Sequence, residues 1–167
     1  MFSMADGDPT PGLWNWAIGK RIDADRVCGA IAGTLERNVG PLGPVPPGDG
    51  GAIMCDVYRV GGDFPTLADV YLAPGDIAEA TVASAVAVRL GAAVLLPDDT
   101  LNPSRYVLAE PDGSLRPVHV DEIETDDGPE RRRVRPCTGA DPSCTNDPGC
   151  DRSRFKPAPT PERPAAA

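Results

Sequence analysis

Residues 76–124, DIAEATVASAVAVRLGAAVLLPDDTLNPSRYVLAEPDGSLRPVHVDEIE, decide the predicted fold. The stretch opens with the most apolar run of the chain, Ile77 to Leu90, and this run predicts a helix that is apolar nearly all the way round. Asp76 is the expected N-cap, with Glu79 as its capping-box partner, and Gly91 stands where glycine commonly ends a helix. We therefore expect a helix that is buried on more than one side.

The second half of this stretch predicts strands. Val94 to Leu96 is short and apolar, as a buried strand would be. Arg105 to Glu110 and Ser114 to Val120 flank Asp112-Gly113, and an Asp-Gly pair between such runs is a strong hairpin signal. Pro117 lacks a backbone donor, so we expect the second strand of this hairpin at a sheet edge.

Upstream, Leu13 to Asn38 has apolar residues at nearly helical spacing, which predicts one broken helix or two short ones. Because Trp14 and Trp16 cannot share one helical stripe, we expect only one of them to pack. The glycine- and proline-rich run Gly40 to Gly51 predicts a loop or linker. Two further strands, Ile53 to Val60 and Thr66 to Leu72, are expected to form a hairpin.

This order predicts an α+β fold: N-terminal helices, a β-hairpin, a buried helix and a three-stranded antiparallel portion, with a disordered C-terminal tail. The length of 167 residues suits a single domain, which we place at 13–130. Residues 1–12 are expected to be disordered. Residues 131–167, rich in Arg, Cys and Pro, are also expected to be disordered.

Charge is unevenly distributed along the chain, whose net charge is −9. Residues 49–130 hold sixteen acidic and four basic side chains, whereas residues 131–167 hold eight basic and four acidic ones. An acidic body repels nucleic acid and anionic membranes, so we expect neither as a partner. The acidic run 121–130 next to Arg131 to Arg135 predicts a solvated segment with local charge pairing.

Sequence motifs for catalysis are scarce. His119 is the single histidine, and no Gly-x-Ser-x-Gly elbow or phosphate-binding glycine loop accompanies it. Asp98 and Asp99 are adjacent, and adjacent side chains of an extended segment point to opposite sides, so they do not naturally share one ion. The prediction is a protein that is not an enzyme and carries no cofactor, with His119 as an ordinary strand histidine.

The five cysteines divide into two groups. Cys28 and Cys55 lie in apolar contexts, where a reduced thiol behaves as a small hydrophobe. The other three, Cys137, Cys144 and Cys150, have the spacing C-x6-C-x5-C and lack the close pair typical of zinc sites. We therefore predict no metal, with these three as weak candidate ligands. No secretory signal precedes them, which predicts a cytoplasmic protein with reduced thiols.

The resulting hypothesis is a non-catalytic, acidic protein-binding module whose partner is a basic protein. The run from Arg89 through Val94 to Asp99, followed by the hairpin from Arg105 to Val120, resembles small bacterial toxin-immunity proteins over about half of the chain. That resemblance implies an inhibitor or antidote to a basic toxin or nuclease. The predicted partner-binding residues are carboxylates: Asp98, Asp99, Asp112, Asp121, Glu122 and Glu124.

Two other hypotheses remain open. One is a metal-binding or hydrolytic protein that uses the tail cysteines or Asp98, Asp99 and His119. The other is a structural subunit of a homo- or hetero-oligomer, in which the apolar helix Ile77 to Leu90 pairs with a second copy or another chain.

Overall fold

The computed structural model describes residues 12–41, 53–98, 104–144 and 150. In chain order its elements are β1 (Gly12–Ile18), α1 (Ala24–Leu35), β2 (Val39–Pro41), β3 (Ile53–Arg59), β4 (Thr66–Ala73), α2 (Glu79–Leu90), β5 (Val94–Pro97), β6 (Arg105–Ala109), β7 (Leu115–Thr125), β8 (Gly128–Pro136) and the 3-10 helix η2 (Pro142–Cys144).

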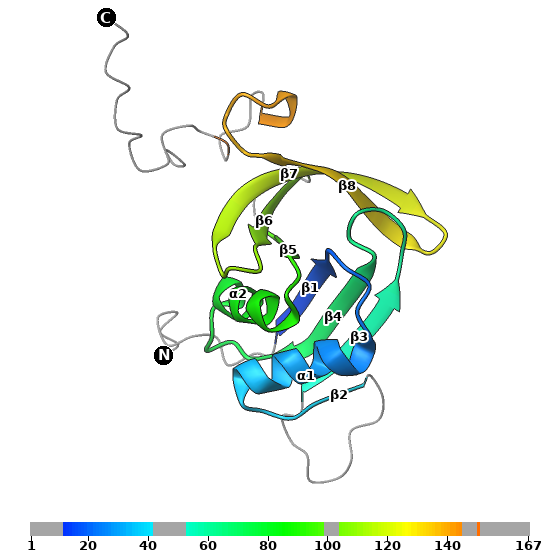
Figure 1. The fold of residues 1–167 in the computed structure, drawn as a ribbon, viewed down its shortest axis with the longest axis vertical. Coiled ribbons are helices and arrows are strands. Elements are labelled where there is room, and N and C mark those ends of the chain that lie inside the picture. The colour runs from blue at the N-terminus through cyan, green and yellow to red at the C-terminus, as the bar shows by residue number, and fades with distance from the viewer. Residues whose placement is uncertain (1–11, 42–52, 99–103, 145–149, 151–167) are drawn as a thin grey trace, which may run out of the picture.

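The strands form one eight-stranded sheet in the order β2-β3-β4-β1-β5-β6-β7-β8, with α1 and α2 side by side against it (Figure 1). Neighbouring strands are antiparallel except for β2 and β3, which are parallel. The predicted α+β arrangement, with several N-terminal helices and a separate three-stranded portion, is therefore wrong. Strands dominate the described residues, and they form a single mixed sheet.

The first error lies in β1, which was predicted to be helical. Trp14, Trp16 and Ile18 are buried and alternate with exposed Leu13 and Asn15, a period of two that favours a strand. Both tryptophans pack, with ring centroids 5.4 Å apart and planes 11° from parallel, so the expectation that only one would pack is also wrong. Every second residue of a strand shares a face, which is why the pair stacks.

The hairpin expected from Ile53 to Val60 and Thr66 to Leu72 is present as β3 and β4, paired antiparallel. Gly40 and Pro41, at the start of the predicted loop, instead belong to the short strand β2. Residues 42–51, the rest of that loop, lie outside the described residues, as do residues 1–11 of the predicted disordered N-terminus.

Helix α2 begins two residues later than predicted, with Ala78 rather than Asp76 at the N-cap. The N-cap makes no side-chain hydrogen bond to the helix, and the Glu79 carboxylate accepts a hydrogen bond from Trp16 Nε1 (2.9 Å). The end is as predicted: Gly91 has a φ of 61°, which glycine adopts without strain. The side chains of α2 that the structure buries pack within the chain, while Val88 is 53% exposed.

The hairpin of β6 and β7 turns at Asp112-Gly113, as predicted. Pro117 is not at an edge, however, because β7 continues to Thr125 and pairs with β8. The acidic run and the arginine cluster, expected to be solvated segments, thus form the two strands of a hairpin. Opposite charges face each other across it, so the predicted local charge pairing is confirmed.

The prediction that the whole tail, residues 131–167, is disordered is wrong, because the same hairpin includes its first residues. Residues 131–136 belong to β8, and the chain then turns through η2 beyond the end of β8, on the side where β7 begins (Figure 1). Cys150 is described and buried, whereas residues 145–149 and 151–167 lie outside the described part.

Both faces of the central strands are buried. One face packs on the helices, through a core that includes Trp16, Ile18, Val27, Ile31, Val70, Val86 and Val94. On the other face the sheet curls, and a second core gathers Ala17, Phe64, Leu67, Leu95, Leu108, Val118 and Val120. The curl brings β8 to the β3–β4 connection, where Asp63 N donates to Arg131 O (2.9 Å). Among the described residues, no helix is long and apolar enough to cross a bilayer.

Candidate metal centre

His119 is placed by the alternation of β7. Its neighbours Val118 and Val120 point into the second core, so the imidazole points to the opposite face, where it is fully buried. Arg105 on β6 and Arg135 on β8 are its cross-strand partners. Two cations therefore flank the histidine, one from each neighbouring strand.

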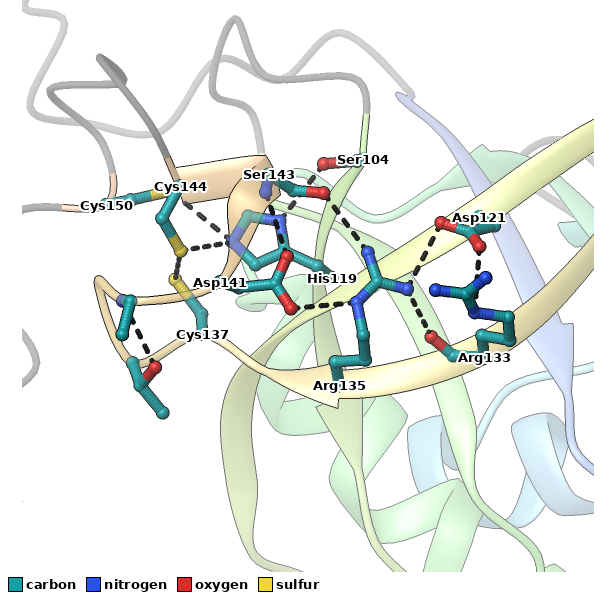
Figure 2. A network of polar contacts seen from close by, with 12 residues as sticks. Ser104, His119, Asp121, Arg133, Arg135, Cys137, Asp141, Ser143, Cys144 and Cys150 are labelled. Carbon is teal, nitrogen blue, oxygen red and sulfur yellow. Dashed lines mark hydrogen bonds and ion pairs between the residues drawn. The ribbon is translucent and has the colours of Figure 1, made fainter.

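Three cysteines close over this imidazole (Figure 2). Cys137 follows directly after β8, and its backbone N–H donates to Pro117 O on β7 (3.1 Å). Cys144 ends η2, where its own N–H donates to Asp141 O (2.8 Å). Cys150 returns to the same point, and all three thiols are at least 94% buried.

The four side chains, here called the His/Cys cluster (His119, Cys137, Cys144 and Cys150), place their donor atoms within 4.8 Å of one another. His119 Nε2 lies 2.9 Å from Cys144 Sγ and 3.5 Å from Cys150 Sγ, and Cys137 Sγ lies 3.9 Å from Cys144 Sγ. Thiolates bound to a tetrahedral zinc at 2.3 Å lie about 3.8 Å from each other. The cluster thus has the size of a zinc coordination sphere, and none of its thiols is in a disulfide.

The imidazole is oriented from its far side. Ser104 directly precedes β6, and its Oγ lies 3.0 Å from His119 Nδ1. With Nδ1–H donating to this hydroxyl, Nε2 keeps its lone pair directed at the three sulfur atoms. Metal-ligating histidines commonly have such a partner, which fixes the tautomer and the ring plane.

A second set of contacts, centred on Arg135, shapes the loop that carries Cys137 and Cys144 (Figure 2). The Arg135 guanidinium donates to Asp141 Oδ2 (2.8 Å), Ser143 Oγ (3.1 Å) and Asp121 Oδ1 (3.1 Å). Asp141 Oδ1 also accepts the Ser143 N–H (2.9 Å). That backbone N–H, together with Arg135, lowers the pKa of the Asp141 carboxyl, so the turn is held by a carboxylate that stays ionised.

Burial governs the thiols of the cluster. It raises the pKa of Cys137 and raises that of Cys150 to about 12. Both thiols are therefore neutral near pH 7 until a cation replaces their protons. Arg105 opposes this effect at Cys137, because its charge favours the thiolate. Arg105 is itself balanced by Asp98 in a buried ion pair of 2.9 Å.

The carboxylates predicted to bind a partner are not brought together. Asp98 pairs with Arg105 inside the protein, and Asp121 pairs with Arg133 and Arg135. Glu122 contacts Arg131 and accepts from Tyr106. Asp112 accepts from Ser114 within its turn, and Glu124 is exposed near the tip of the β7–β8 hairpin. Asp99 lies outside the described residues.

Sequence reasoning missed the grouping of His119 with the cysteines. It searched for two thiols within a few residues of each other, and this cluster has none. The β7–β8 hairpin supplies the proximity instead, by bringing Cys137 back beside His119 from 18 positions away. An available signal was that the single histidine and the three clustered cysteines flank one strongly charged, hairpin-like segment.

Comparisons with known proteins add no assignment. No family model, no curated protein and no solved structure matches this chain. The candidate site therefore rests on its own geometry.

Proposed function

We propose that this protein binds one zinc ion through the His/Cys cluster, as a structural centre that attaches the segment from Cys137 to Cys150 to the sheet. The observation that carries the proposal is the convergence of four buried donor atoms within 4.8 Å. Buried cysteines do not need a histidine nearby, so a single imidazole directed at three thiols is difficult to explain by packing alone.

The donor set favours zinc over other common ions. Three thiolates and one imidazole are borderline-soft ligands, whereas magnesium and calcium require oxygen. Tetrahedral S3N coordination is a usual arrangement of structural zinc. Four protein ligands also leave no open position for a water or a substrate, which argues for a structural rather than a hydrolytic role.

The metal would join parts of the chain that lie apart in the sequence. His119 lies within the sheet, Cys137 just beyond it, Cys144 in η2, and Cys150 further along the chain. Apart from the cluster, this segment has few apolar side chains to bury, and small apolar cores commonly depend on metal for stability. Zinc would therefore supply the stability that hydrophobic burial does not.

Metal analysis of the full chain, purified without chelator, tests the proposal. We expect one zinc per chain, lost in Cys144→Ser and retained in the matched variant Cys55→Ser, whose thiol lies outside the cluster. A cobalt-substituted sample should show the strong thiolate-to-metal absorption of tetrahedral sites. Zinc-free protein whose melting temperature is unchanged by a chelator would contradict the proposal.

A second candidate function is the acidic protein-binding module. One observation favours it: among the described residues, no ion pair engages the exposed carboxylates Glu124, Asp126 and Asp127 at the tip of the β7–β8 hairpin. Such a tip would attract a basic partner, including the toxin or nuclease implied by the immunity-type hypothesis. The test is a pull-down at low and high salt, with Glu124→Gln/Asp126→Asn/Asp127→Asn as the comparison. Retention that ignores both salt and the substitutions would exclude this role.

A further inference from the structure

Strand β8 contains a β-bulge beside the His/Cys cluster. His119 lies opposite Arg135 and Asp121 lies opposite Arg132, so two steps along β7 correspond to three steps along β8. Arg133, within the extra step, has a φ of 59°, the left-handed conformation that the first residue of a G1 bulge adopts. Glycine is the usual residue there, because a side chain disfavours this conformation. The chain therefore holds a strained residue at this point of the strand.

The bulge changes which residues of β8 share a face. In a regular strand, side chains on one face are two residues apart. Arg131 lies over the Tyr106 ring, 5.6 Å from its centroid, and Val134 packs on the same second core, although the two are three residues apart. Continued from Arg131 without the extra residue, the alternation would turn Cys137 toward this core as well. With the bulge, Cys137 lies on the opposite face, where His119 is.

The same change of face places Arg135. Its guanidinium donates to Asp141 and Ser143 because it lies on the cluster side of β8 (Figure 2). The bulge thus positions both a candidate ligand, Cys137, and the side chain that shapes the loop beyond it.

Several contacts hold Arg133 in its left-handed conformation. Its backbone N–H donates to Asp63 Oδ2 (3.2 Å) in the β3–β4 connection, and Asp63 N donates to Arg131 O (2.9 Å). The Arg133 carbonyl accepts from Arg135 Nη1 (2.7 Å), and its guanidinium pairs with Asp121 (3.2 Å). Since the Arg133 side chain is 74% exposed, these contacts rather than burial fix its backbone.

We propose that Arg133 and Asp63 are positioning residues of the His/Cys cluster: by maintaining the bulge in β8, they turn Cys137 to the side of the sheet on which His119 lies. Neither residue is a ligand, and both act through the path of the β8 backbone. The consequence for zinc binding rests on the proposed function, whereas the meeting of the four side chains requires no metal.

The first measurement compares Arg133→Val with Arg133→Gly in the full chain. Both remove the guanidinium and its ion pair with Asp121, but glycine adopts a positive φ without strain and a β-branched residue does not. We expect Arg133→Gly to bind zinc at least as tightly as the wild type. Arg133→Val should bind it about 5- to 30-fold more weakly, the factor that corresponds to the steric penalty of a left-handed residue. Competition titration with a zinc chelator measures both.

The second measurement needs no metal. Diamide oxidises neighbouring thiols of the chelated, reduced protein to a disulfide, and Cys137 Sγ lies 3.9 Å from Cys144 Sγ. We expect this disulfide, mapped by mass spectrometry after alkylation, to form about 5- to 30-fold more slowly in Arg133→Val than in Arg133→Gly, because the bulge is less populated. A loss of stability alone would not slow the reaction, since unfolding exposes thiols.

A second variant, Asp63→Ala, leaves Arg133 in place and decides the matter if Arg133→Val does not fold. It removes the acceptor of the Arg133 N–H, so it should also slow the disulfide. Asp76→Ala is its control, because Asp76 pairs with Arg37 at the surface (3.5 Å), and it should leave the rate unchanged. The near-UV circular dichroism of the stacked tryptophans checks that each variant is folded.

The two measurements separate this inference from the proposed function. Equal disulfide rates in folded Arg133→Val and Arg133→Gly, or in Asp63→Ala and Asp76→Ala, would overturn the positioning role, whatever the zinc affinity. Wild-type protein that binds no zinc, together with the expected difference in disulfide rates, would instead support the positioning role and remove the zinc function.

Discussion

At the residue scale, substitution of Ser104 most directly tests how His119 is oriented. Ser104→Ala removes the hydroxyl that lies 3.0 Å from Nδ1, and the tautomer that directs Nε2 to the cysteines loses its partner. Loss of such a partner typically weakens metal binding by about 10- to 100-fold. Competition titration with a zinc chelator measures the change, and Ser104→Thr should restore most of the affinity.

The matched control is Ser114→Ala, which removes a hydroxyl that donates to the turn residue Asp112 (2.7 Å), at the far end of the β6–β7 hairpin from Ser104. Its zinc affinity should equal that of the wild type. An equal loss in both variants would mean that Ser104 acts through general stability rather than through the imidazole.

Asp98 carries a second prediction at this scale. Its ion pair with Arg105 is buried, with the two side chains 7% and 3% exposed. Asp98→Asn leaves the Arg105 charge without its carboxylate, which typically costs about 3–5 kcal/mol of unfolding free energy. Urea denaturation followed by the fluorescence of the two buried tryptophans measures this loss.

Glu110→Gln is the comparison, because Glu110 pairs with Arg116 at a similar distance (3.0 Å) but at the surface. Exposed pairs contribute about 1 kcal/mol or less, since water already solvates both charges. If both variants lost a similar amount of unfolding free energy, burial would not make the Asp98–Arg105 pair more important for stability than the exposed pair.

At the scale of elements, the orientation of α2 can be tested by making the same substitution, valine to alanine, on opposite sides of the helix. Val86 is fully buried against the sheet, and Val88 is 53% exposed. Val86→Ala should lower the unfolding free energy by about 2 kcal/mol, from lost burial and the remaining cavity. Val88→Ala should change it by less than about 0.5 kcal/mol. Urea midpoints compare the two, and equal values would contradict the observed orientation of α2.

Elements with local signals were predictable. The strands β3 and β4 alternate clearly, and the β6–β7 turn has an Asp-Gly pair at its tip, with Gly113 at a φ of 90°. The end of α2 at Gly91 was predictable for the same reason, since a positive φ demands a particular residue type. In each case the deciding interactions lie within a few positions of one another.

Elements that depend on distant partners were not predictable in this way. Trp14, Ala17 and Ile18 fit a helical period as well as a strand, and only pairing with β4 and β5 decides between them. The arginines of β8 suggest a solvated segment until the acidic residues of β7 are placed opposite them. The candidate metal centre depends on that same pairing, so it was missed with the strand.

At the scale of the whole molecule, removal of zinc should destabilise the protein. A ligand present at about 1,000 times its Kd contributes about 4 kcal/mol to the folded state. For a domain of this size, that corresponds to a decrease in Tm of about 8–16 °C. Differential scanning calorimetry with and without a strong chelator measures the change. Cys144→Ser should already have the lower Tm, and chelator should not lower it further.

The segment that follows β8 should also become accessible when zinc is removed. Asp141 and Arg135 keep part of its turn ordered, but among its described residues the buried ones are the three cysteines of the cluster. Limited proteolysis should therefore cut between Cys137 and Cys150 in chelated protein and spare this region in the zinc-bound form. Equal cleavage in both samples would show that the metal does not hold the segment.

The position of His119 in the middle of β7 has a consequence for how the protein reaches its native state. A one-residue slip of β7 against its neighbours would turn the imidazole to the other side of the sheet, away from all three sulfur atoms. Metal binding would then fail in the hairpin shifted by one residue and succeed in the native alignment. Zinc would in this way favour the native strand pairing, because the correctly aligned hairpin gains the free energy of metal binding and the shifted hairpin does not.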